Sequence, residues 1–79
     1  MDSAREEIAL LWRDLFQIDT ITPDANFFEL GGDSVLAMML SFSVAERFSI
    51  DVPPELLFEA STLDGFSDQI IKLQTAGAV

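Results

Sequence analysis

The stretch Phe27-Phe28-Glu29-Leu30-Gly31-Gly32-Asp33-Ser34-Val35-Leu36 places two adjacent glycines directly before a long apolar segment. Glycine readily adopts positive φ angles and lets other atoms approach closely, and it adds no side chain that would cover a neighbouring hydroxyl group. We therefore expect a turn at Gly31 and Gly32, followed by a helix. Ser34 should lie exposed at the start of that helix and is the expected functional centre.

Two residues compete to cap this helix. Serine and aspartate are both strong N-cap residues, because their side-chain oxygens accept hydrogen bonds from the free N–H groups of the first turn. Ser34 could therefore have only this structural role. If Asp33 caps the helix instead, Ser34 becomes the first helical residue and its hydroxyl is free for chemistry. A phosphate ester there would meet the positive end of the helix dipole, although Asp33 opposes a second anion.

Four helices are expected from the spacing of apolar residues and from capping residues. A capping box, Ser3-x-x-Glu6, opens the first helix. Pro54 fits the first turn of a short third helix, and Thr62 fits the cap of the fourth. In chain order the helices are Ser3 to Phe16 or Gln17, Ser34 to Arg47 or Phe48, a short segment through Leu56, Leu57 and Phe58, and a segment that includes Leu63, Phe66, Ile70 and Leu73. The expected fold is all-α, a small four-helix bundle of three longer helices and one short one.

A stretch of roughly 17 residues separates the first two helices, which is long for a loop in a compact domain. We expect its large apolar residues to anchor it on the core, because exposing so many of them would be unfavourable. Trp12 should also lie in the core, with its indole N–H near the surface. Residues 75–79 have no periodicity and should fray. Residues 1–79 are read as a single domain with a core from about residue 3 to 74. The expected loop anchors are Ile18, Ile21, Phe27, Phe28 and Leu30.

The expected second helix has two apolar faces. At about 100° per residue, one sector contains Leu36, Ala37, Leu40 and Val44, and the other contains Val35, Met38, Met39 and Phe42. One apolar stripe is enough to join a core, so the second either packs in a tightly wrapped bundle or stays open to a partner. Methionine side chains adapt to several partner surfaces. Because Ser34 lies beside the second sector, we interpret that sector as a partner-binding face.

Composition excludes several functions. The net charge of −10 argues against binding nucleic acid or an anionic membrane, and predicts partners with basic patches. No apolar run approaches the roughly 20 residues that cross a bilayer, and the acidic start Met1-Asp2-Ser3 is unlike a signal peptide. We expect a cytoplasmic monomer. The acids Glu55, Glu59, Asp64 and Asp68 are read as a solvated surface.

An enzyme or a metal site is poorly supported. The chain has no cysteine and no histidine, so it lacks a thiol nucleophile, an imidazole base and the usual zinc ligands. A serine hydrolase would need such a base, and its nucleophile motif would need glycine where Leu36 stands. A calcium loop from Asp24 would have Glu29 in place of its glycine and Val35 in place of its last carboxylate. No catalytic residue and no metal ligand is predicted.

Residues Asn26 to Ala37, followed by Leu40, resemble the signature of carrier proteins. The likeness is strongest to peptidyl carrier proteins, the thiolation domains of nonribosomal peptide synthetases. The segment Phe58-Glu59-Ala60-Ser61-Thr62-Leu63 also resembles the stretch before the last helix of that family. The resemblance covers most of the chain and implies an acyl-carrier-protein-like fold.

The resemblance also implies the chemistry at Ser34. A phosphopantetheinyl transferase would move 4'-phosphopantetheine from coenzyme A to this hydroxyl, beside Gly31, Gly32 and Asp33. An aminoacyl, peptidyl or other acyl group would then be carried as a thioester. An adenylation or other acyl-loading enzyme would supply it, and condensation, ketosynthase or tailoring enzymes would receive it by docking on the second helix. The chain would be a non-catalytic shuttle.

Two alternatives remain open at this stage. The pairs Phe27-Phe28 and Gly31-Gly32 favour the peptidyl branch, but Asp33 also occurs throughout acyl carriers, so a polyketide-type carrier or hybrid use is possible. Ala25 stands where the family often has an aspartate just before the paired phenylalanines, so the resemblance does not extend to that residue's loop hydrogen bond, and the attachment chemistry is unaffected. The other alternative is an unmodified helical interaction module in which Ser34 is only a cap. The first and last residues fit a discrete carrier, and an excised domain would look the same.

Overall fold

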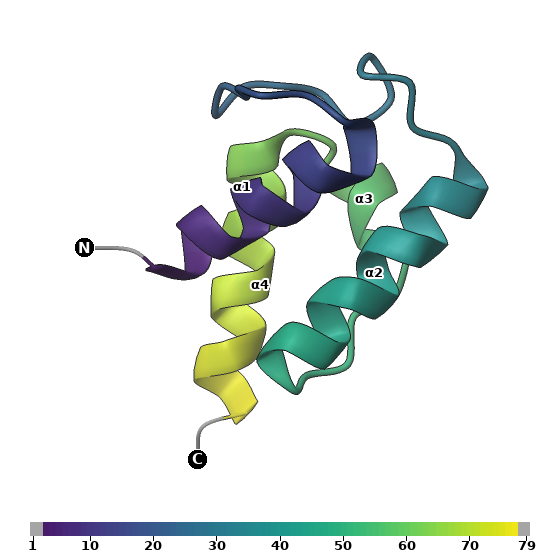
Figure 1. The fold of residues 1–79 in the computed structure, drawn as a ribbon. Coiled ribbons are helices and arrows are strands. Elements are labelled where there is room, and N and C mark those ends of the chain that lie inside the picture. The colour runs from purple at the N-terminus through teal and green to yellow at the C-terminus, as the bar shows by residue number, and fades with distance from the viewer. Residues whose placement is uncertain (1–2, 78–79) are drawn as a thin grey trace.

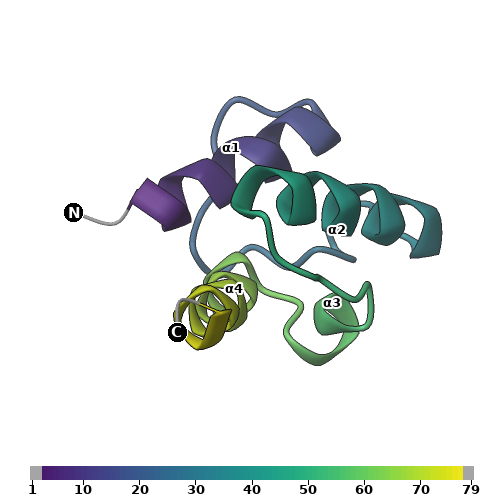
Figure 2. The same cartoon turned by 90° about the horizontal axis from the view of Figure 1, so that it is seen from below.

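Four helices account for most of residues 3–77, the part of the chain that the computed structural model describes. They are α1 (Ser3–Phe16), α2 (Ser34–Phe48), α3 (Leu56–Glu59) and α4 (Leu63–Gly77). Helix α1 packs against α2 and α4, and α3 packs against α4 (Figure 1). Viewed from below, α1 and α2 lie on one side of the molecule and α3 and α4 on the other (Figure 2). The all-α prediction is confirmed, including one short helix and a long first loop.

Most helix boundaries agree with those predicted from the sequence. Thr62 caps α4, because its Oγ1 accepts a hydrogen bond from the N–H of Gly65 at 3.1 Å. Pro54, however, lies in a turn before α3 rather than in its first turn; the carbonyl of Pro54 accepts from the N–H of Leu57 at 3.1 Å. The side chain of Ser3, on which the predicted capping box depends, lies outside the described residues.

The predicted fraying after residue 74 is wrong for residues 75–77, which continue α4. The hydroxyl of Thr75 donates to the carbonyl of Ile71 at 2.9 Å, one helical turn earlier. Residues 78 and 79 lie outside the described residues. Within residues 3–77, no helix combines the length and the apolar character that crossing a membrane requires.

The core is organised around Trp12, which is completely buried. Its ring meets Phe27 from the loop at 5.5 Å between centroids and Phe66 from α4 at 6.0 Å. The indole nitrogen is also buried and has no hydrogen-bond partner within residues 3–77. The prediction of an N–H near the surface is therefore wrong. The buried apolar residues are Ile8, Trp12, Phe27, Ala37, Leu40, Val44, Val52, Leu57, Leu63, Phe66 and Ile70.

Ion pairs join the helices at their exposed edges. Arg5 on α1 pairs with Asp64 and Asp68 on α4, and Arg47 on α2 pairs with Glu7 on α1. Asp64 and Asp68 are exposed, as a solvated surface requires, and each also pairs with Arg5. All of these side chains keep substantial solvent contact, so the pairs contribute little to stability.

The long first loop is fixed by its backbone as well as by its side chains. The N–H of Phe27 donates to the carbonyl of Ser61 at 2.7 Å, and the N–H of Leu63 donates to the carbonyl of Ala25 at 2.9 Å. These bonds tie the loop to the segment between α3 and α4. Four of the predicted anchors are confirmed as packing residues: Phe27 is buried, and Ile21, Phe28 and Leu30 are half-buried against the core. Ile18 is half-buried but is not among the residues that pack on the core.

The last part of the loop folds back on Phe27. The side chain of Asn26 accepts hydrogen bonds from the N–H groups of Phe28 and Glu29, at 2.9 and 3.1 Å. Gly31 has a φ angle of +109°, and the N–H of Gly32 donates to the carbonyl of Phe27 at 3.0 Å. A Cβ atom on Gly32 would lie 2.3 Å from the Phe27 ring. Position 31 therefore needs glycine for its backbone angle, and position 32 needs it for space.

We expect Gly32→Ala to destabilise the fold by about 1–3 kcal/mol, because the buried Phe27 ring must move to admit one methyl group. Urea unfolding followed by circular dichroism would measure the change. Glu29→Ala is the matched control, since Glu29 is exposed in the same turn. An unchanged unfolding midpoint for Gly32→Ala would show that this contact does not hold the loop.

Candidate functional site

The geometry at the start of α2 shows which of Asp33 and Ser34 caps the helix. Asp33 has extended backbone angles, φ −142° and ψ −173°, and its Oδ1 accepts a hydrogen bond from the N–H of Leu36 at 2.9 Å. Asp33 is therefore the N-cap and Ser34 is the first residue of the helix. Ser34 is exposed, and its hydroxyl makes no hydrogen bond to any residue from 3 to 77. The hydroxyl is free for chemistry.

The start of α2 and the Asp33 carboxylate set the electrostatics around Ser34, and they act in opposite directions on an anion. The first turn of α2 presents the positive end of the helix dipole, and the Asp33 carboxylate is directed to the backbone of that turn. Basic side chains lie elsewhere: Arg5 and Arg13 on α1, Arg47 in the last turn of α2, and Lys72 on α4. A phosphate ester on Ser34 would therefore be stabilised by the helix terminus and not by an ion pair.

The two apolar sectors of α2 have different environments. Ala37, Leu40 and Val44 of the first sector are buried, and Leu36 is half-buried against the core. The second sector stays open: Val35 is 64% exposed, Met38 61%, Met39 53% and Phe42 65%. The structure thus brings Gly31, Gly32, Asp33 and Ser34 together at one end of α2, with the open sector running on from them.

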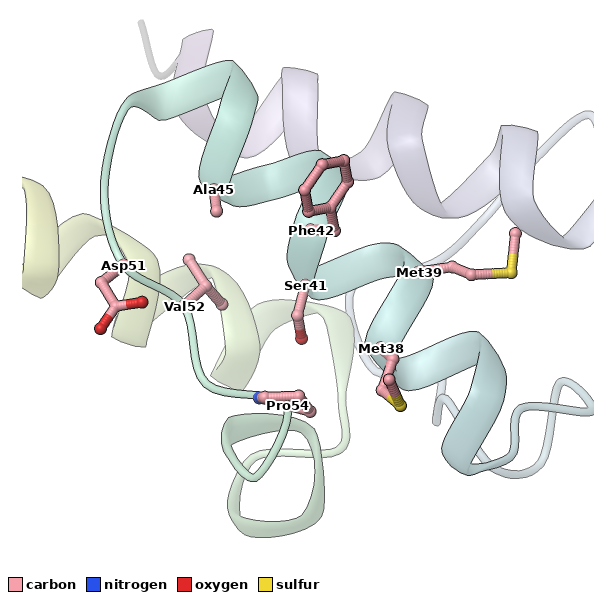
Figure 3. A pocket seen from close by; sticks show the side chains of 8 residues that line it. All are labelled: Met38, Met39, Ser41, Phe42, Ala45, Asp51, Val52 and Pro54. Atoms are coloured by element: carbon pink, nitrogen blue, oxygen red, sulfur yellow. The ribbon is translucent and has the colours of Figure 1, made fainter.

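A groove runs between α2 and the segment before α3, with a volume of about 500 Å³ (Figure 3). Helical periodicity in the sequence does not predict this groove, because one of its walls comes from a segment that lacks such periodicity. The stretch Val52-Pro53-Pro54 was the available signal, since two prolines hold the chain extended. We call this feature the α2 groove; it is lined by Met38, Met39, Ser41, Phe42, Ala45, Asp51, Val52 and Pro54.

Two exposed or buried features of this region were also not predicted from the sequence: the burial of Ser41, which lines the α2 groove, and the exposure of Phe58 on α3. Ser41 is only 2% exposed, yet its hydroxyl has no hydrogen-bond partner within residues 3–77. Phe58 on α3 is 55% exposed, and its ring packs on Phe28 at 5.1 Å. Phe28 in turn contacts Phe27 at 5.3 Å. A series of aromatic contacts therefore connects the core to the surface of α3.

Comparison with known proteins gives consistent matches. A family model described as "Phosphopantetheine attachment site" matches residues 6–70. The chain is 34% identical over 73 residues to phosphinothricin tripeptide synthetase PhsB of Streptomyces viridochromogenes. It is 37% identical over 65 residues to gramicidin S synthase 2 of Brevibacillus brevis. These alignments cover 92% and 82% of the chain, but only 6% and 2% of the two synthetases.

The fold is also found among solved structures. The chain is similar to a structure described as a non-covalent extended docking domain complex of the Pax NRPS, PaxA T1-CDD/PaxB NDD. The TM-score is 0.85 and the identity 32%, over 95% of this chain and 72% of that one. The family match contains the exposed serine and its capping aspartate within residues 6–70. The chain therefore belongs to the phosphopantetheine-binding carrier family, whose members bind 4'-phosphopantetheine, and is a carrier domain of the peptidyl type.

Proposed function

We propose that this chain is a single non-catalytic carrier domain that holds its cargo on a phosphopantetheine arm attached to Ser34. The cargo is an aminoacyl or peptidyl group, in nonribosomal peptide or hybrid assembly. The arm supplies a terminal thiol that forms a thioester with the cargo, which the chain itself cannot do because it has no cysteine. The partners supply the catalysis: a phosphopantetheinyl transferase, a loading enzyme, and condensation or tailoring enzymes.

The state of the Ser34 hydroxyl is the main observation that supports this function. The Ser34 hydroxyl is exposed and without a protein partner, while Asp33 beside it makes the capping hydrogen bond. A serine needed only for structure would be the residue that caps the helix. Here the cap is already provided, and the hydroxyl is presented to solvent by a loop whose backbone is bonded to the α3–α4 junction.

The surface around Ser34 supports a role in docking. The open sector of α2 begins next to the attachment residue and ends at Phe42, so an enzyme that contacts it would hold Ser34 nearby. Partners must bind briefly and then release the carrier, and methionines provide adaptable contacts for such a surface. The net charge of −10 would favour partners with basic rims.

We expect Ser34→Ala to abolish attachment of the arm without changing the fold, because the hydroxyl is the acceptor and makes no contact that the helix needs. The measurement is intact mass after incubation with coenzyme A and a broad-specificity phosphopantetheinyl transferase. The wild type should gain one phosphopantetheinyl group. Ser43→Ala, another exposed serine of α2, is the control and should gain it too.

Two outcomes would contradict this assignment. One is a mass gain that persists in Ser34→Ala, which would place the attachment at another residue. The other is the absence of any gain in folded wild-type protein while the same transferase modifies a reference carrier. The second outcome would favour an unmodified helical interaction module.

We expect Phe42→Glu to lower the kcat/KM of the transferase for this carrier by about tenfold, because a charge replaces an apolar anchor at the interface. Stability should change by less than about 0.5 kcal/mol, since the side chain is exposed. Ser43→Glu adds the same charge to the other flank of α2, and its kcat/KM should stay near the wild-type value. An equal loss in the two variants would mean that the open sector is not the docking face.

A further inference from the structure

A second groove lies along α1, between this helix, the first loop and the start of α4. It consists of two pockets, of about 220 and 500 Å³, whose linings share Glu6, Ala9 and Ile21. Apolar atoms make up most of the lining of both pockets. We call the two pockets together the α1 groove; among the other residues that line it are Arg13, Leu63 and Ser67.

Two hydrogen-bond donors of the α1 groove lack partners. Ser67 lines the smaller pocket and is only 1% exposed, yet its hydroxyl makes no hydrogen bond to any residue from 3 to 77. In the larger pocket, Nη1 of Arg13 donates to the carbonyl of Asp19 at 3.1 Å, but the buried Nε of Arg13 has no partner within the same residues. Buried donors are normally paired, so both groups favour a ligand that brings acceptors such as carbonyl oxygens.

Glu6 adds a negative charge to the part that the two pockets share. Its side chain is exposed and makes no ion pair within residues 3–77. The acid Asp64, which also lines the smaller pocket, is by contrast already paired with Arg5. A carboxylate without a counterion beside apolar surface favours a ligand that has a cationic group next to an apolar group.

An extended peptide provides these groups at a suitable spacing. Glu6 and Arg13 are seven positions apart on α1, a rise of about 10 Å. Three to four residues of an extended chain cover this length, at about 3.3 Å per residue. Such a segment carries a carbonyl at every residue for the two donors, apolar side chains for the floor of the groove, and one basic side chain for Glu6.

The peptide should come from another protein and not from a second copy of this chain. Two copies would each carry a net charge of −10 and would repel each other. The basic residues of this chain also lie in helices and not in extended segments, so a second copy offers no strand with a basic side chain. These residues are Arg5 and Arg13 in α1, Arg47 in α2 and Lys72 in α4.

We propose that the α1 groove is a second docking surface, which binds an extended segment of a partner protein with a lysine or arginine beside an apolar residue. The basic side chain pairs with Glu6, and backbone carbonyls accept from Ser67 and Arg13. The first half of α1 and the start of α2 lie at opposite sides of the molecule (Figure 1 and Figure 2). A partner held in the α1 groove therefore leaves Ser34 and the open sector of α2 accessible to a second protein.

The test titrates the unmodified protein with two short peptides that differ only in charge. Both are acetylated and amidated at their ends; one has the sequence Val-Leu-Lys-Val and the other has glutamine in place of the lysine. Backbone amide chemical shifts report binding. We expect saturable shifts in residues 5–13, 20–24 and 63–67, and none in residues 34–42. The lysine peptide should bind about threefold more tightly than the glutamine peptide, the size of effect that one solvent-exposed ion pair can give.

Three variants separate the contributions. Glu6→Gln should make the two peptides bind equally, whereas Glu46→Gln, which removes an exposed charge from α2, should leave the difference unchanged. Ser67→Ala should weaken the binding of both peptides by about threefold, because one hydrogen bond is lost. It should not lower the unfolding temperature of the free protein, because the hydroxyl that it removes has no partner there.

Equal binding of the two peptides by the wild type, or a difference that survives in Glu6→Gln, would overturn the inference. So would the absence of saturable shifts, or shifts confined to the open sector of α2. The titration uses protein without an attached arm, so its result is independent of the chemistry at Ser34. Failure of the proposed function appears differently, as a folded protein that gains no mass from the transferase.

Discussion

The close contact between Phe27 and Gly32 is the constraint on which the position of Ser34 depends. The Phe27 ring occupies the space that a side chain at position 32 would need, and it is packed against Trp12 in the core. The backbone of Phe27 is bonded on one side to Ser61 and on the other to Gly32. Because Asp33 and Ser34 follow at once, the start of α2 is held to the core by a segment that would otherwise be a long free loop.

Features formed by residues that are close together in the sequence were predictable, and features that depend on residues far apart in the sequence were not. Helical periodicity and the Thr62 cap involve neighbouring residues, so the boundaries of α1 and α2 and the start of α4 were predictable. The choice between Asp33 and Ser34 as cap was not, because both side chains suit it. The buried indole of Trp12 and the bonds from the loop to Ser61 and Leu63 depend on residues distant in sequence, and no local pattern encodes them.

Helix α2 has one side that packs in the core and another that is exposed to solvent. Leu40 and Val44 fix it in the core, while Met38 and Phe42 remain exposed on the other side. The candidate site was predictable as far as Ser34 and this second sector, since both follow from α2 alone. The α2 groove was not, because its other wall comes from the extended segment near Pro54 and because Ser41 fell in neither predicted sector. An exposed serine on a loop that is bonded to the core, beside an adaptable apolar surface, would suit the carrier role proposed above.

The backbone hydrogen bonds of the loop before Ser34 should hold this loop as firmly as the core is held. Native-state amide hydrogen exchange tests it at the N–H groups of Phe27 and Leu63, which donate to Ser61 and Ala25. We expect both amides to exchange as slowly, within about tenfold, as the amide of the buried Ile70 in α4, because they should open only when the whole fold opens. Exchange at the rate of an unprotected loop, with Ile70 still protected, would show that the loop opens independently of the core.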